Sequence, residues 1–377
     1  MDMSRADTGG SVDTLDDLGR VIDTDAHVTE HLGDVLPYVE DRYSGVREII
    51  DRADHPLYDV YTINHPTPPS IHSEFGDIYG QDAAPTRRRD AKLEEMAEFG
   101  IDRGILDPTL NLALNTVDNP TYAVALANAY NSWLLDSFLD GQERLVGNLL
   151  VAPQRPDLAA EEIDRLADEE AFVGIQIPST GLVPPAGHRR YDPIYEAAAE
   201  HGLPIAFHGA ASATFHNFAS MRRWNETYAE DHALVHPYTQ MWNLTTMLYR
   251  GTFERFPDLD VVFQESGIAW VPFLKWRLDD HYMELSDDLP LLTRLPSEYV
   301  DESVYFTTQP LGLTAASPKH MAQAIEMTGP GNVMYASDLP HADFDPPEEL
   351  FDRIAPAFDG ETVRGMMGGT AAGLYGL

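Results

Sequence analysis

The sequence contains no cysteine, only three lysines and no long apolar run. Without cysteine the chain cannot form a disulfide and offers no thiolate to a metal ion. No apolar stretch approaches the roughly 20 residues that span a bilayer. The segment Met1 to Gly19 is polar and acidic and lacks the apolar centre of a signal peptide. We therefore expect a cytoplasmic protein that does not interact with membranes.

Positive charge is also scarce. Lysine and arginine number 25 against 62 aspartates and glutamates, which gives a formal net charge of −37. Such a surface repels phosphate and anionic head groups, which excludes nucleic acid as a partner. Self-repulsion of this size is best tolerated at high salt, where the Debye length falls to about 3 Å at 1 M. We expect a salt-adapted organism, with an ordinary acidic cytosolic enzyme as the alternative.

What the chain does contain is a recurring pattern of short apolar segments with little polar alternation. This pattern is typical of strands that are buried on both faces of a parallel sheet. The intervening segments have helical periodicity, as in residues 122–139, and Ser317-Pro318 and Asp345-Pro346 indicate an N-cap followed by proline at the first helical position. The predicted strands are residues 21–28, 101–107, 145–153, 173–178, 204–209, 260–266, 304–309 and 333–338.

Eight alternations of strand and helix predict a (β/α)8 TIM barrel or a large doubly wound sheet. We favour the barrel because 377 residues fit one barrel with insertions, and no glycine-rich dinucleotide fingerprint follows a strand. We expect residues 1–18 to form a flexible acidic tail and residues 19–377 to form a single domain. Two insertions, residues 54–86 and 210–240, follow strands at the mouth of the barrel and are expected to build the substrate pocket or a lid.

Residues able to bind a metal or move protons stand at the C-terminal ends of several predicted strands, where barrel active sites are built. Asp25 and His27 are two residues apart on the first strand and therefore point the same way. A carboxylate and an imidazole can share one divalent cation. Taken singly, each such residue is equally compatible with a helix cap or a satisfied polar group at a strand end. The set comprises Asp25, His27, His208, Glu265, Asp338 and His341.

These residues and their surroundings resemble the amidohydrolase superfamily, in particular the amidohydrolase-related branch typified by aminocarboxymuconate semialdehyde decarboxylase. The resemblance runs from about residue 21 to residue 377. It rests on Asp25-x-His27 followed by Glu30, on Phe-His208-Gly, on the run from Gly251 to Asp260, on Glu265-Ser-Gly-Ile-Ala-Trp-Val-Pro, on Ala-Ser-Asp338-x-Pro-His341 and on the glycine-rich C-terminus. It implies a metal-dependent barrel enzyme that acts on a small molecule and forms a homodimer.

The resemblance also implies a metal-binding set of Asp25, His27, His208 and Asp338. The family usually offers His-x-His or Glu-x-His on strand one, so Asp25 is a departure. Two carboxylates and two imidazoles suit zinc, with manganese as the alternative because oxygen ligands favour harder ions. The fourth predicted strand, residues 173–178, lacks the lysine that bridges two metals in binuclear relatives, which favours one ion. Glu265 stands where the family has a catalytic histidine.

Two reactions fit this site. In the hydrolase hypothesis, which we favour from the sequence, a metal-activated water attacks a carbonyl group. Asp338 then acts as the base, with Glu265 or His341 as its partner. The alternative is a decarboxylase of an aromatic or unsaturated acid, whose anionic substrate needs a fixed cation to orient it. A third hypothesis is an inactive barrel that serves as a binding protein, and the complete ligand set argues against it.

The candidate substrate-binding residues come from the second insertion and its C-terminal border. They are Arg222, Trp224 and His236. An arginine can orient an anionic group, while an aromatic ring supplies apolar contact area.

Overall fold

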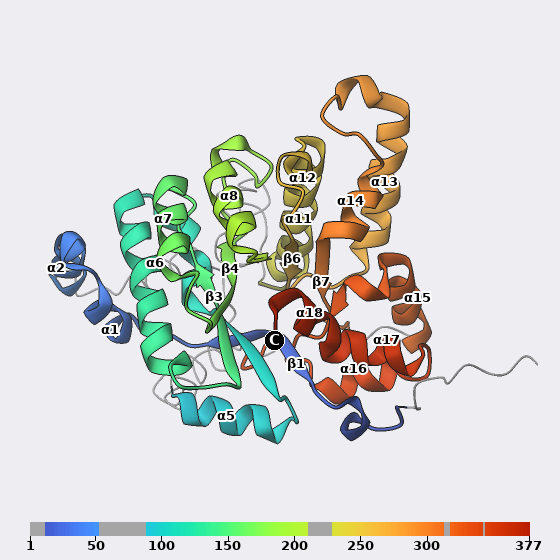
Figure 1. The fold of residues 1–377 in the computed structure, drawn as a ribbon, viewed down its shortest axis with the longest axis horizontal. Coiled ribbons are helices and arrows are strands. Elements are labelled where there is room, and N and C mark those ends of the chain that lie inside the picture. Colours follow the sequence, from blue (N-terminus) through green and yellow to red (C-terminus); the bar gives the residue numbers. More distant parts are fainter. Residues whose placement is uncertain (1–11, 53–87, 210–227, 313–316, 342–343) are drawn as a thin grey trace, which may run out of the picture.

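The computed structural model describes residues 12–52, 88–209, 228–312, 317–341 and 344–377. Eight parallel strands follow one another around the sheet in sequence order, each hydrogen-bonded to the next (Figure 1). All eight predicted strands are confirmed, and the fold is a (β/α)8 barrel. The strands are β1 (Ile22–Val28), β2 (Arg103–Pro108), β3 (Leu145–Leu150), β4 (Phe172–Pro178), β5 (Ile205–His208), β6 (Val261–Gln264), β7 (Val304–Thr307) and β8 (Val333–Met334).

The barrel is closed between β1 and the segment that follows β8. The Thr24 N–H donates to the carbonyl of Tyr335 at 3.1 Å, and the His27 N–H donates to the carbonyl of Leu339 at 2.9 Å. The Asp338 N–H donates in turn to the carbonyl of Asp25 at 2.9 Å. Since β8 has only two residues, Asp338 lies beyond the strand itself. These backbone hydrogen bonds hold it beside β1.

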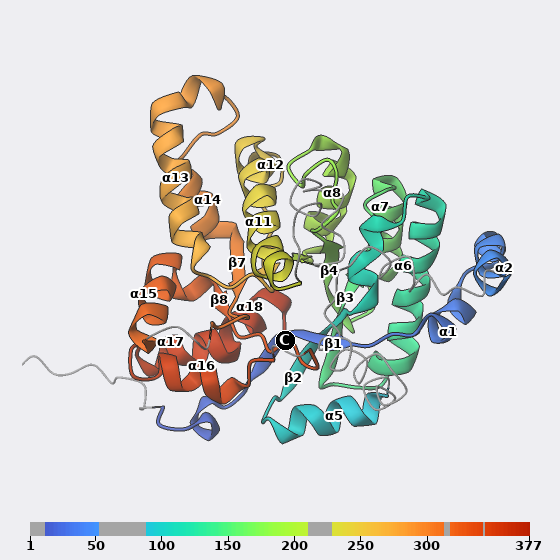
Figure 2. The ribbon, with the colours of Figure 1, turned by 180° about the vertical axis from the view of Figure 1, so that it is seen from behind.

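Helices surround the strands in both views of the molecule (Figures 1 and 2). None of the helices in the described ranges is long and apolar enough to cross a lipid bilayer. They are α1 (Leu32–Val35), α2 (Ser44–Arg52), α5 (Arg89–Glu98), α6 (Pro120–Leu134), α7 (Pro156–Leu166), α8 (Asp192–His201), α11 (Tyr228–Tyr249), α12 (Thr252–Arg255), α13 (Trp270–Leu285), α14 (Pro296–Ser303), α15 (Pro318–Thr328), α16 (Pro347–Ile354), α17 (Gly360–Arg364) and α18 (Thr370–Tyr375).

Helix starts agree with the sequence at one predicted cap and differ at another. Ser317 caps α15 as expected, since its side chain accepts the N–H of Lys319. The cap predicted at Asp345 is wrong, because α16 begins at Pro347 and Pro346 holds the N-cap position. The carboxylate of Asp345 instead accepts the N–H of Leu311 at 2.6 Å, so it secures the loop after β7.

Two other segments refine the sequence prediction. The helix expected over residues 122–139 consists of α6 and a π-helical turn, Leu135–Leu139. Within the part of the expected tail that the structure describes, Leu15–Leu18 form a 3-10 helix and Leu18 is buried. Regular structure therefore begins before residue 19.

The interior of the barrel changes from apolar to polar along the strands. Residues near the strand starts, among them Ile22, Val146 and Val262, form an apolar cluster that includes Ala371 and Tyr375 of α18. This C-terminal helix covers the bottom of the barrel, and the C-terminus lies beside β1 (Figures 1 and 2). Buried polar side chains follow further along the strands: Asp107, Asn148, Gln176, His208 and Gln264. The polar end is the mouth at which barrel active sites form.

Candidate metal centre

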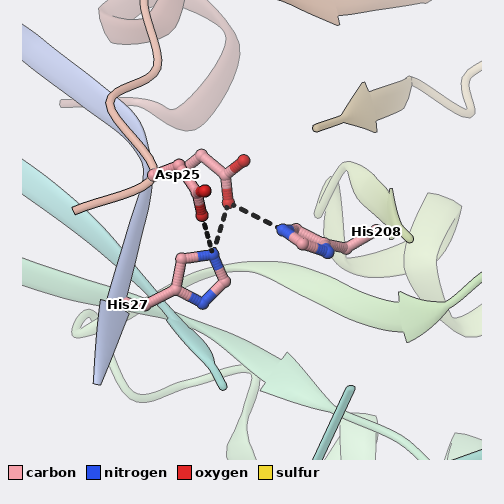
Figure 3. Close-up of side chains that lie close together, drawn as sticks. Asp25, His27 and His208 are labelled. Carbon is pink, nitrogen blue, oxygen red and sulfur yellow. Dashed lines mark ion pairs between the residues drawn. The ribbon is translucent and has the colours of Figure 1, made fainter. Parts of the chain in front are cut away.

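Four buried side chains meet at the mouth of the barrel. They are the predicted ligands Asp25 and His27 of β1, His208 of β5, and Asp338 after β8, and one ligand atom of each lies within 4.8 Å of the others. Oδ1 of Asp25 is 3.2 Å from Nε2 of His27 and 3.2 Å from Nε2 of His208. Figure 3 shows the carboxylate of Asp25 facing both rings. Oδ1 of Asp338 is also 3.2 Å from Nε2 of His27.

The donor set fits a divalent cation. Two ligands at about 2.1 Å from a tetrahedral ion are separated by about 3.4 Å, close to the distances observed here. Nδ1 of His27 donates to the carbonyl of Pro108 at 2.9 Å, and Nδ1 of His208 lies 2.6 Å from the carbonyl oxygen of Gly209. These contacts leave Nε2 of each ring as the metal-binding atom. Both Nε2 atoms and both carboxylate oxygens of Asp25 are buried without a hydrogen-bond partner, an arrangement that a cation would satisfy.

The electrostatics of the cluster couple the four groups. Burial lowers the pKa of His208, but the charge and hydrogen bond of Asp25 and the charge of Glu265 together raise this pKa to about 9. Burial likewise opposes protonation of His27, yet Asp25 and Asp338 hold its pKa well above the usual value. Despite their burial, the pKa values of Asp25 and Asp338 are lowered by the neighbouring histidines. The pocket therefore favours anionic carboxylates that face positive charge, which a divalent ion supplies.

Asp338 lies at the start of a short chain of polar contacts. Its φ of 63° lies in the left-handed region that a non-glycine residue seldom adopts, and such backbone strain is concentrated at functional sites. Oδ1 of Asp338 accepts a hydrogen bond from Nδ1 of His341 at 2.5 Å. Nε2 of His341 lies 3.2 Å from the hydroxyl oxygen of Thr109. The predicted catalytic pair Asp338 and His341 is thus in direct contact.

Glu265, the third predicted catalytic residue, directly follows β6 and also has a positive φ, 48°. Its Oε2 is 3.3 Å from Nε2 of His208. Its Oε1 is 3.1 Å from Nδ1 of His236 and 3.8 Å from Nε2 of His232. The carboxylate therefore lies between the four-residue cluster and a pair of histidines on α11.

Two buried carboxylates support the site from outside the predicted set. Glu30 accepts the backbone N–H groups of Thr109 and Asn111 at 3.0 and 2.6 Å. Asp107 accepts hydrogen bonds from Gln264 and from Asn148. Burial, followed by the charge of Asp25, raises the pKa of Asp107 to about 6. Sequence reasoning did not select Asp107 or Thr109, although Asp107 is the polar last residue of the predicted strand 101–107 and could have been found by that signal.

The predicted substrate-binding residues are only partly described. His236 is buried on α11 and contacts Glu265, as noted above. Arg222 and Trp224 lie outside the described residues, as do insertion residues 54–86 and the part of the second insertion before residue 228.

Three known proteins illustrate what the chain is similar to. Gamma-resorcylate decarboxylase from Polaromonas sp. JS666 is 23% identical over 281 residues, which cover 71% of this chain and 81% of that protein. The structure of 5-carboxyvanillate decarboxylase from Sphingomonas paucimobilis is 24% identical, with a TM-score of 0.69 over 95% of this chain and 99% of the other. Dihydroxybenzoic acid decarboxylase from Polaromonas sp. JS666, with bound manganese and the inhibitor 2-nitroresorcinol, is 18% identical, with a TM-score of 0.67 over 95% of this chain and 97% of the other.

The structural matches share the barrel with this protein. A family model described as Amidohydrolase matches residues 22–377, which include every strand of the barrel and all four residues of the cluster. The chain therefore belongs to the amidohydrolase family of enzymes.

Proposed function

We propose that the protein is a metal-dependent decarboxylase of an aromatic acid that carries a hydroxyl group beside the carboxylate. The proposal is supported by the four buried side chains that could hold a metal ion, together with the activities of the proteins that this chain is similar to. The curated relative and both named structural neighbours are decarboxylases of aromatic acids. They favour the decarboxylase alternative over the hydrolase that the sequence led us to prefer.

In this proposal Asp25, His27, His208 and Asp338 hold one divalent ion. Manganese becomes the first choice and zinc the second, because two of the four ligands are carboxylates and a structural neighbour contains manganese. When bound, the ion supplies a Lewis acid that attracts the carboxylate and phenolic oxygens of a substrate.

The side chains around the ligands must deliver one proton. When the bond between the ring and the carboxylate breaks, its electron pair stays on the ring carbon and carbon dioxide leaves. That carbon then takes up a proton, and we assign its delivery to Asp338 and His341. Their 2.5 Å contact allows a proton to pass between them, and the hydroxyl of Thr109 lies on the far side of the His341 ring.

We propose that the substrate is oriented by the three residues that the sequence analysis selected for substrate binding. Arg222 is proposed to pair with the anionic substrate and Trp224 to contact its ring. His236 is proposed to lie at the border of the pocket, where its contact with Glu265 holds it near the metal-binding cluster.

The test compares two sets of compounds with manganese-loaded protein. One set contains hydroxylated aromatic acids, including 2,6-dihydroxybenzoate and 5-carboxyvanillate, with trapped carbon dioxide as the readout. The other contains esters, amides and lactones of similar size, with acid release as the readout. We expect carbon dioxide from at least one aromatic acid, and release at least about 10²-fold slower from the Asp338→Asn variant with the same acid. Hydrolysis in the second set without carbon dioxide from any acid would favour the hydrolase hypothesis instead.

A further inference from the structure

A second group of potential metal ligands lies beside the first. It comprises His232 and His236 of α11 and Glu265, and one ligand atom of each lies within 4.8 Å of the other two. The side chains of His236 and Glu265 are 6% and 7% exposed, whereas that of His232 is 29% exposed. The group is therefore buried on one side and open on the other.

The spacing of the two histidines suits a shared ligand. Residues four apart on a helix lie on the same face, one turn from each other, and histidine pairs at this spacing bind zinc in helical metal sites. The rings of His232 and His236 are 5.0 Å apart between centroids. Two histidines and a glutamate form a known catalytic ligand set that leaves a coordination position open for water or substrate.

Glu265 connects this group with the four-residue cluster. Its Oε2 approaches Nε2 of His208 at 3.3 Å, while its Oε1 approaches Nδ1 of His236 at 3.1 Å. The 3.3 Å separation resembles the roughly 3.0–3.4 Å between neighbouring ligands of one ion. Nδ1 of His236 donates to the carbonyl of Glu265 at 2.9 Å, so Nε2 is the nitrogen of this ring that is left for a metal. Glu265 has a φ of 48°, in the left-handed region that a non-glycine residue seldom adopts, and such backbone strain is concentrated at functional sites.

We propose that His232, His236 and Glu265 form a second divalent-cation site, with Glu265 bridging it to the site of Asp25, His27, His208 and Asp338. The lack of a lysine on β4 led us to expect one ion, but the carboxylate of Glu265, directly after β6, could bridge two ions in place of that lysine. Paired ions in such sites lie about 3.5–4 Å apart. The second ion would add a fixed positive charge at the mouth, where an anionic oxygen of a substrate could bind. This proposal does not depend on whether the protein is a decarboxylase or a hydrolase. Its test measures metal content, so it can fail without affecting the proposed function.

The competing explanation is a hydrogen-bonded group without metal. Nδ1 of His236 lies 2.9 Å from the carbonyl oxygen of Glu265, so hydrogen bonds without a metal ion could also link the two residues. The two explanations differ in metal stoichiometry and in the coupling between ions.

The experiment strips the full-length protein with a chelator, restores Mn²⁺ by dialysis and measures metal per chain by elemental analysis. We expect about two ions in the wild type and about one in the His232→Ala/His236→Ala variant. His201→Ala is the matched control, since His201 of α8 pairs with Asp164 of α7, outside both clusters, and the loss of this exposed histidine should leave the stoichiometry unchanged. Electron paramagnetic resonance of the wild type should show spin-coupled manganese, and Glu265→Gln should weaken that coupling.

Either of two results would overturn the proposal. One is saturation of the wild type at a single ion with both Mn²⁺ and Zn²⁺. The other is an undiminished content of two ions in the double variant. Circular dichroism establishes whether the double variant folds. If it does not, the partly exposed His232 is replaced alone as His232→Asn, with the same expected loss of one ion.

Discussion

Replacing Glu30 by alanine tests how the wall of the site is held together. Glu30 is buried two residues after β1 and accepts three hydrogen bonds: from the N–H of Thr109 at 3.0 Å, from the N–H of Asn111 at 2.6 Å and from the side-chain amide of Asn111 at 3.0 Å. The loop that it secures carries the hydroxyl of Thr109 to His341. Glu30→Ala should therefore lower both stability and turnover.

The expected loss of stability follows from these contacts. A hydrogen bond to a charged acceptor contributes about 1.5–3 kcal/mol, and the variant leaves two backbone N–H groups buried without a partner. The three contacts share one carboxylate, so their contributions do not add fully. Burial also raises the pKa of Glu30, which means that the variant removes some desolvation cost. We expect a decrease of about 3 kcal/mol in the free energy of unfolding, and a smaller decrease for Glu30→Gln, which keeps an acceptor oxygen.

Urea denaturation followed by circular dichroism measures this change, with the slope of the transition as a check on two-state behaviour. Glu200→Ala, at an exposed position near the end of α8, is the matched control and should stay within about 0.5 kcal/mol of the wild type. A cost below about 1 kcal/mol for Glu30→Ala would refute the supporting role that we assign to this carboxylate.

Three further outcomes are expected. With a net charge of −37, the melting temperature should rise with added potassium chloride, and a constant value up to molar salt would contradict the salt adaptation that we infer. Asp338→Asn should lower turnover by at least the roughly 10²–10⁴-fold typical of lost acid–base catalysis, and a near wild-type rate on the true substrate would exclude Asp338 as the proton carrier. Burial raises the pKa of Asp260 to about 6, above its unfolded value. The folded protein is therefore most stable with this carboxyl protonated, below about pH 4, and loses stability as the pH rises through 6 and the buried group becomes charged. Asp260→Asn should therefore raise the melting temperature at pH 8 but not at pH 4, and equal shifts at both would show that burial of this carboxyl is not the cause.

The parts of the fold that local sequence determines could be predicted. Buried parallel strands have continuous apolar sequences, which identified all eight strands, and the two-residue spacing placed Asp25 and His27 on one face of β1. Ser317 could be predicted as an N-cap because its hydroxyl accepts a backbone N–H only two residues further along, that of Lys319 in the first turn of α15. The assignment of Asp345 failed because a distant backbone N–H, that of Leu311, competes for the same carboxylate.

The parts that depend on packing between distant segments could not be predicted. No local pattern indicates that α11 brings His232 and His236 to Glu265, which lies some thirty residues further along the chain. The hydrogen bond from Thr109 to His341 likewise depends on closure of the barrel between β1 and β8. The candidate metal ligands could be predicted because they lie at strand ends. The residues that contact them could be identified only from the three-dimensional structure.

The most direct measurement of the central claim is the location of the bound ion in crystals of the manganese-loaded protein, from anomalous scattering at the manganese edge. Our account predicts a strong peak at about 2.0–2.3 Å from ligand atoms of Asp25, His27, His208 and Asp338. A manganese-loaded crystal with no peak among these four residues, in which their side chains are bonded only to one another, would contradict it.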